Sequence, residues 1–133
     1  MVVSVFRLNL LRAMYLLIGI GLILSVWPGV FSSIGKAADS HTVVGAILVS
    51  FSLLALLGLR YPLKLLPILI FELIWKSLWL LGFALPAYLT GSMDEYTAGT
   101  TFACAMGVIL TPLVIPWRYV VSEYLMAKGS IWR

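Results

Sequence analysis

Long apolar stretches separated by short polar segments dominate the chain. The apolar stretches cover residues 10–30, 42–59, 63–89 and 96–117, and none of them shows the strict polar–apolar alternation of a barrel strand. A membrane-spanning helix needs about 20 mainly apolar residues, with a range of about 17–25. In lipid, a helix also satisfies its backbone hydrogen bonds internally. The pattern therefore predicts an all-α integral membrane protein with four spans.

The polar segments between these stretches are short. Residues 31–41 carry serine, glycine, lysine and aspartate, residues 60–64 form a tight turn, and residues 90–95 form a polar turn. Short connections favour antiparallel neighbours. We therefore predict one transmembrane domain, residues 1–133, folded as an up-down-up-down four-helix bundle. The tail after Trp117 mixes apolar and charged residues, which suits either a short extension of the fourth helix or a helix along the headgroups.

The composition is also that of a membrane protein. Of 133 residues, 62% are hydrophobic and 11% are charged, with a mean hydropathy of +1.10, whereas an average soluble domain is about 45–50% apolar and about 25% charged. So much apolar surface must face lipid. A signal peptide is the rival interpretation of the first stretch, because Arg7 and Arg12 precede it and Lys36-Ala37-Ala38 follows it. The stretch is longer than a signal core of about 7–15 residues, so we interpret it as a span.

The distribution of charge predicts the orientation. The net charge is +4, and the basic residues lie at the ends of the apolar stretches rather than in a nucleic-acid-binding patch. One side of the membrane would hold Arg7, Arg12, Arg60, Lys64, Arg118, Lys128 and Arg133, and the other would hold Lys36 with Asp39, Asp94 and Glu95. The positive-inside rule then places both termini in the cytoplasm. We expect a multi-pass protein of a bacterial inner membrane, with the lipid bilayer as its first partner and no nucleic acid.

Glu72 and Lys76 are the most informative residues, because they lie near the middle of the third predicted span. Four positions apart on a helix, they meet on one face in the favourable order. A lone charge at that depth costs at least about 2.5–3.5 kcal/mol, and an ionisable residue inside a span indicates function by default. The competing interpretation is a structural ion pair that fixes helix packing. Both remain open.

Two tryptophans flank this pair. Trp75 and Trp79 lie near mid-depth, although tryptophan favours the membrane interface, where its N–H finds a partner. Their indole N–H groups could bond to Glu72 or to a bound ligand, or the rings could simply fill space. The periodicity of the third span predicts a stripe that faces the bundle interior, made of Tyr61, Leu65, Ile68, Glu72, Lys76, Trp79 and Phe83.

Other residues suggest packing rather than chemistry. Thr97, Thr100, Cys104, Gly107 and Thr111 recur at three- and four-residue steps along the fourth span, where small side chains allow close helix approach. His41 is interpreted as a surface histidine, with a pH-sensitive gate or a shared metal ligand as the alternative. One cysteine and one histidine cannot form a paired metal-ligand motif. We expect no catalytic residue, metal or cofactor from motifs alone.

The tract Arg60-Tyr61-Pro62-Leu63-Lys64 through Glu72-Leu73-Ile74-Trp75-Lys76 resembles a stretch in uncharacterised small bacterial membrane proteins. The overall plan is similar to the DoxX-like group of four-span proteins. The resemblance implies a small four-span membrane fold. It implies no particular activity, because the group has no single established one.

The sequence favours a binding or accessory membrane protein. Glu72, Lys76, Trp75 and Trp79 would form a site for a hydrophobic ligand, a lipid or a partner subunit, and a homo-oligomer is a further candidate. The alternative is a proton-linked transporter or membrane enzyme that uses Glu72 as a proton carrier. A transport path usually needs a polar route, and the sequence offers one paired site.

Overall fold

The computed structural model describes residues 3–130, and all regular secondary structure in that range is helical. Four helical segments are long and apolar enough to cross a membrane: Val5–Ser32, Ser40–Leu57, Leu66–Leu89 and Glu95–Val114. The predicted all-α class and the number of candidate spans are therefore confirmed. The boundaries differ from the predicted ones by a few residues. Helix-capping side chains and prolines explain these differences.

The first segment bends near its end. Helix α1 (Val5–Ser25) begins at Ser4, whose side chain accepts the Arg7 N–H, and α2 (Trp27–Ser32) follows with Pro28 in its first turn. Helix α3 (Ser40–Leu57) begins two residues earlier than predicted. Its cap is a reciprocal one, in which Asp39 accepts the Thr42 N–H and the Thr42 hydroxyl accepts the Asp39 N–H. Such a capping box satisfies N–H groups that the first turn leaves unpaired.

The third segment is not one regular helix. Helix α4 (Leu66–Trp79) begins three residues later than predicted, because residues 58–65 form a turn and Pro67 is the proline in the first helical turn. A π-helical turn, η1 (Leu80–Ala84), then leads into α5 (Leu85–Leu89), which has Pro86 in its first turn. A π turn inserts extra backbone into the helix, so it changes which residues share a face.

The last segment ends at a proline. Helix α6 (Glu95–Val114) begins at Asp94, which accepts the Thr97 N–H at 2.7 Å. The hydrogen bonds from Thr97 hold the pKa of Asp94 below its ordinary value. Ile115 is extended, as the residue before a proline prefers. Pro116 therefore separates α6 from α7 (Trp117–Val120) and the π turn η2 (Val121–Leu125).

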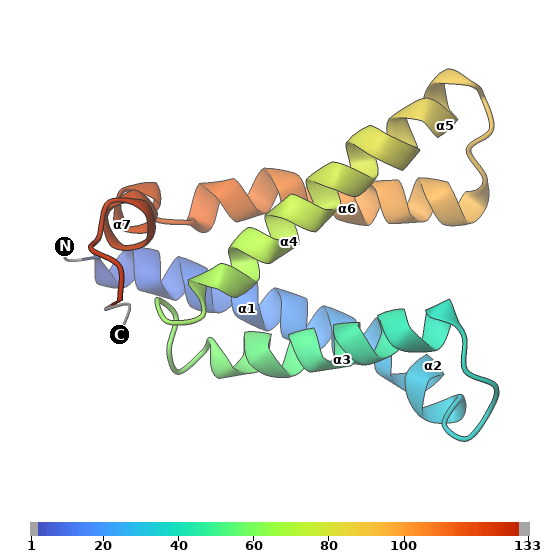
Figure 1. Ribbon diagram of the computed structural model, residues 1–133, viewed down its shortest axis with the longest axis horizontal. Coiled ribbons are helices and arrows are strands. Elements are labelled where there is room, and N and C mark those ends of the chain that lie inside the picture. The colour runs from blue at the N-terminus through green and yellow to red at the C-terminus, as the bar shows by residue number, and fades with distance from the viewer. Residues whose placement is uncertain (1–2, 131–133) are drawn as a thin grey trace.

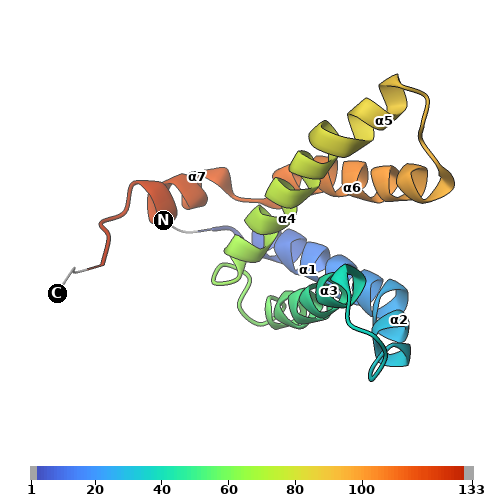
Figure 2. The ribbon, with the colours of Figure 1, turned by 45° about the vertical axis from the view of Figure 1, so that its right-hand side comes forward.

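The four long helices associate mainly as two pairs, α1 with α3 and α4 with α6 (Figure 1). The pairs meet at the end of the molecule where the chain begins, and they diverge toward α2 and α5, as the rotated view also shows (Figure 2). We call these the joined end, made by the start of α1, residues 58–65, the end of α6 and α7, and the splayed end, made by α2, α5 and the connections that follow them.

Long-range hydrogen bonds hold the joined end together. Arg12 Nε donates to the Leu59 carbonyl at 3.0 Å, and the buried Tyr15 hydroxyl donates to the Pro62 carbonyl at 2.8 Å. Arg7 donates to the Leu113 carbonyl at 2.7 Å. These bonds satisfy carbonyls that helix ends and turns leave without partners. The main apolar core lies beside them, and its fully buried members include Leu11, Tyr15, Leu66, Leu69 and Ile115.

The C-terminal segment does not extend the fourth helix. Figure 1 shows α7 end-on while the long helices run across the picture, so α7 lies crosswise to them. The chain turns at Ile115 and Pro116, where the proline cannot continue the α6 hydrogen-bond ladder. Of the two interpretations left open by the sequence, the crosswise direction favours a helix along the headgroups over a straight continuation.

Candidate functional site

Glu72 and Lys76 form an ion pair on one face of α4. The Lys76 ammonium contacts Glu72 Oε1, and the exposed fractions of the two side chains are 14% for Lys76 and 5% for Glu72. The predicted pairing is therefore confirmed, and Glu72 faces the protein interior rather than open surface. Because both charges lie in a segment able to cross a membrane, each would be costly there without the other.

Trp75 is the second hydrogen-bond partner of the Glu72 carboxylate. Its indole N–H donates to Glu72 Oε2 at 3.2 Å, so each carboxylate oxygen has a partner of its own. The Lys76 ammonium also lies 5.7 Å from the centroid of the Trp75 ring, within the range of a cation–π contact. Of the two alternatives that the sequence offered for Trp75, the structure shows the bond to Glu72.

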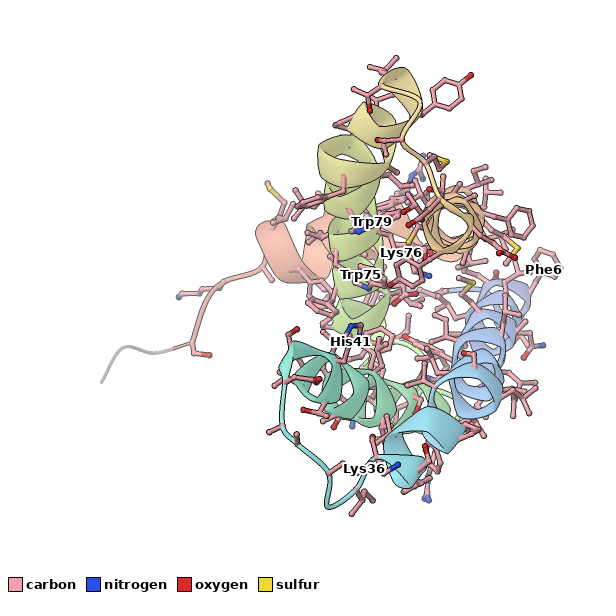
Figure 3. The ribbon with its side chains drawn as sticks, turned by 90° about the vertical axis from the view of Figure 1, so that its right-hand side faces the viewer. Phe6, Lys36, His41, Trp75, Lys76 and Trp79 are labelled. Atoms are coloured by element: carbon pink, nitrogen blue, oxygen red, sulfur yellow. The ribbon has the colours of Figure 1, made fainter. Side chains whose placement is uncertain are left out.

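Trp79 is placed one turn further along the same helix. It is half-buried, and its indole N–H makes no hydrogen bond with any other described residue. Figure 3, which looks from the splayed end, shows Trp75, Lys76 and Trp79 in succession along α4, with Lys76 lying between the ribbons of α4 and α6. The sequence predicted one site made of four residues. In the structure, Glu72, Lys76 and Trp75 are in direct contact.

Gly107 of α6 receives the Lys76 side chain. A Cβ atom added at Gly107 would lie 2.7 Å from Lys76 Nζ and 2.9 Å from its Cδ, so only glycine allows this approach unless the lysine moves. Close packing at Gly107 was predicted from the sequence, but its contact with the charged Lys76 side chain was not. The spacing of residues within one span could not reveal this contact, because it depends on how α4 crosses α6.

Two more small residues continue this face of α6. Cys104 and Thr111 lie about one turn on either side of Gly107, and both are buried. The Thr111 hydroxyl has no hydrogen-bond partner among residues 3–130. A buried hydroxyl without a partner is uncommon, because its desolvation costs about 1–3 kcal/mol. It provides a free donor on the helix that contacts Lys76.

The interior stripe predicted for the third segment is only partly correct. Glu72 is buried as predicted, but Leu66 and Leu69 are buried with it in place of the predicted Leu65 and Ile68, which are half-buried. Phe83 is 68% exposed instead of facing inward. The π turn at Leu80–Ala84 accounts for Phe83, which lies within it, because residues of a π turn leave the phase of a regular α-helix. The site therefore lies on the regular part of the helix, before the π turn.

A separate concave region lies away from this site. A cavity of about 1000 Å³ at the splayed end is lined by the end of α1, α2, the following connection and the start of α3, with Tyr96 of α6. His41 and Lys36 contribute to its wall, and Glu72 does not. Figure 3 shows these two basic residues at the start of α3 and in the connection before it. The Glu72 site is thus a polar contact between two helices rather than a preformed chamber.

No protein-family model, curated protein or solved structure matches this chain. The class of this protein is therefore defined by its own structure. Residues 3–130 are all-α and include four helices able to span a membrane, one of which carries a Glu–Lys–Trp cluster.

Proposed function

We propose that this chain is a small binding protein of a bacterial inner membrane, which holds a hydrophobic molecule with a polar, oxygen-bearing end at Glu72 and Lys76. In this proposal the helices form an up-down-up-down bundle with both termini in the cytoplasm. The observation that carries it is the nearly buried Glu72 carboxylate, paired with Lys76 and Trp75 inside a segment able to span a membrane.

The hydrogen-bonding capacity of Lys76 supports a ligand with acceptor oxygens. A lysine ammonium has more N–H donors than one carboxylate oxygen can use, and Glu72 is its one ion-pair partner within residues 3–130. Trp75 and Trp79 supply the aromatic surface that typically lines a site for an apolar body. A quinone-like molecule or a lipid carbonyl has this combination of an apolar body and acceptor oxygens.

The arrangement of the helices supports access from the bilayer. The two helix pairs diverge toward the splayed end (Figure 2), and the Lys76 side chain keeps an exposed fraction of 14%. Several large residues beyond the pair, including Leu78, Leu81 and Phe83, are exposed on the surface that lipid would cover. A molecule dissolved in the membrane could reach Lys76 by this route.

The alternative proposal, a proton-linked transporter or enzyme, has less support. Proton paths through membranes use chains of ionisable groups. Glu72 is the only acidic residue within the four candidate spans apart from Glu95, which begins the last one at the surface. The assignment to a DoxX-like group likewise stays a proposal, and it leaves the choice between binding and transport unchanged.

Ligand-dependent quenching of tryptophan fluorescence tests the binding proposal. We expect saturable quenching of the purified wild-type protein by one class in a panel of quinones, sterols and lipids. Lys76→Met should weaken that binding by about 10-fold or more, because a hydrogen bond to a charged group contributes about 1.5–3 kcal/mol. Trp79→Phe should reduce the amplitude of quenching.

Trp27→Phe is the matched control. Trp27 donates to Ser52 at 2.8 Å in the other helix pair, so its loss removes one emitter without touching the site. We expect ligand affinity in this variant to equal that of the wild type. If no member of the panel gives saturable quenching in the wild type, the binding proposal is wrong and a partner subunit becomes the better explanation of the site.

The orientation is tested by cysteine accessibility. Asp94→Cys lies between the third and fourth candidate spans, opposite the joined end. In intact cells, a membrane-impermeant thiol reagent should label this cysteine from outside the cytoplasm, whereas Lys64→Cys should react only after the membrane is opened. The reverse pattern would contradict the proposed topology.

A further inference from the structure

Two cations converge on one aromatic ring in the turn between α3 and α4. The Arg60 guanidinium carbon lies 5.4 Å from the centroid of the Tyr61 ring, and Lys64 Nζ lies 5.1 Å from it. Both basic side chains are exposed, while Tyr61 is half-buried. The turn therefore places two like charges around one aromatic ring, and no acidic residue among residues 3–130 forms an ion pair with either.

This turn has a fixed relation to the membrane. It joins two of the candidate spans, Ser40–Leu57 and Leu66–Leu89, so it must lie at a membrane surface if they cross. The Tyr15 hydroxyl fixes its backbone through the Pro62 carbonyl. If the helices cross, the Arg60–Tyr61–Lys64 group lies near the lipid headgroups, on a backbone that the Tyr15 hydrogen bond anchors.

The C-terminal segment reaches the same turn. The Tyr124 hydroxyl donates to the Leu63 carbonyl at 3.1 Å, which brings α7 and η2 beside residues 60–64. This segment lies crosswise to the spans (Figure 1) and exposes Trp117, Leu125 and Met126 together with Arg118. A helix with apolar side chains on one side and basic ones nearby is typical of the plane of the headgroups.

We propose that Arg60, Tyr61 and Lys64 form a binding site for the headgroup phosphate of an anionic phospholipid. The two cations would share the phosphodiester oxygens, with Arg60 suited to bidentate contact. The apolar residues of the crosswise segment would lie along the glycerol and upper acyl chains. The neighbouring lipid surface makes a bilayer lipid the occupant rather than a soluble phosphate. Basic clusters at the ends of spans attract anionic lipids in the same way.

Lipid titration with matched single substitutions tests this site. Delipidated protein in detergent is titrated with phosphatidylglycerol or phosphatidylcholine, and bound lipid is counted by native mass spectrometry. We expect the wild type to prefer phosphatidylglycerol. Lys64→Gln should weaken that binding about fivefold, as expected for one cation near the surface. Tyr61→Leu, which keeps both charges but removes the ring, should also weaken it.

Lys36→Gln is the control, because it removes the same charge at the splayed end. If Lys36→Gln weakens phosphatidylglycerol binding as much as Lys64→Gln does, the attraction depends on net charge and the site is wrong. Equal uptake of both lipids by the wild type would also overturn it. Competition by millimolar inorganic phosphate would show a soluble-anion site instead, which contradicts the lipid proposal.

The inference is independent of the proposed function. It requires that the helices cross the membrane, but it does not require a ligand at the ion pair. Glu72→Gln should therefore bind phosphatidylglycerol as the wild type does. Loss of selectivity in Lys64→Gln with unchanged ligand quenching, or the converse, would separate the two sites. Because Lys64 is exposed and makes no hydrogen bond with another described residue, Lys64→Gln should keep the helical content of the wild type.

Discussion

The α1–α3 and α4–α6 interfaces both use glycine to bring helices together, but different side chains approach the glycines. In the first pair, a Cβ at Gly58 would lie 2.7 Å from the Tyr15 ring, and one at Gly19 would lie 2.7 Å from Leu56 Cδ2. In the second pair, the side chain that approaches Gly107 is Lys76. The buried polar residue of the first interface, Ser52, is neutral, whereas the second interface contains a charge.

This difference indicates which of the two interfaces we expect to have been selected for function. An apolar side chain over a glycine gains van der Waals contact at no electrostatic cost, which is how helices associate in lipid. A lysine in the same position needs a counterion, and a buried ion pair is often no more stable than apolar residues of similar volume. Packing alone could have been achieved with leucine or methionine at Lys76. The α1–α3 pair is accordingly the scaffold, and the α4–α6 pair is the candidate site.

Removal of one charge should have the largest effect. Glu72→Ala leaves Lys76 buried without its partner, and breaking a buried pair in this way costs about 3–5 kcal/mol. The double variant Glu72→Ala/Lys76→Ala should be more stable than the single one, since no charge is left behind. Unfolding free energies in mixed micelles measure both variants.

The relative stability of the single and double variants tests whether buried Lys76 depends on Glu72. If the double variant is less stable than Glu72→Ala, then buried Lys76 does not need a counterion. The α4–α6 interface would then not differ from the α1–α3 interface in the way described above. Ligand quenching should be lost in the double variant, which lacks the ammonium that would bind the ligand oxygens, and weakened in Glu72→Ala, where no carboxylate positions Lys76.

Crowding of the scaffold interface should come second. Gly58→Ala places a methyl group against three atoms of the Tyr15 ring, which is rigid and fully buried. Overpacking of this kind costs about 1–3 kcal/mol. It should also displace the Tyr15 hydroxyl from the Pro62 carbonyl. Thermal unfolding in detergent would show the loss, with ligand affinity of the surviving folded fraction unchanged. A fall in ligand affinity would mean that the scaffold and the site are coupled.

Local features of the site were predictable from the sequence, and its tertiary partners were not. The Glu72–Lys76 pair follows from helical spacing alone, and so does the proximity of Trp75. The contact of Lys76 with Gly107 depends on how α4 crosses α6, which no spacing within one helix determines. Phe83 shows the same limit, because it lies in a π turn, which changes the face that regular periodicity assigns to it.

The fold shows the same division. Hydropathy predicted the four segments, because lipid requires each to be long and apolar. It could not predict that the pairs diverge at one end, since the bonds that join the other end come from Arg7, Arg12 and Tyr15 to carbonyls far along the chain. Those bonds depend on backbone groups, which all residues share, so the sequence carries little signal for them.

Crowding of the charged interface should have a smaller effect on stability. Gly107→Ala meets the far end of a flexible lysine rather than a ring. The Lys76 side chain can move, so we expect a loss of about 1 kcal/mol or less, below that of Gly58→Ala. Binding should respond more strongly, because the Lys76 ammonium would shift within the site while it stays paired with Glu72. Parallel unfolding and quenching titrations of the two alanine variants give the comparison directly. A larger stability loss in Gly107→Ala than in Gly58→Ala would reverse the roles assigned to the interfaces.

Glycines without neighbours should show the smallest effect. Gly21 in α1 and Gly99 in α6 have nothing within 4 Å of an added Cβ, and both lie within α-helices. Alanine lowers the conformational freedom of the unfolded chain, so Gly21→Ala and Gly99→Ala should be neutral or more stable by up to about 1 kcal/mol. These variants separate the cost of a methyl group in a contact from its effect on helix formation, in one helix of each pair. If either variant loses as much stability as Gly58→Ala, glycine in these helices matters for some reason other than close approach, and the contrast between Tyr15 and Lys76 as its partners would no longer explain the difference between the two interfaces.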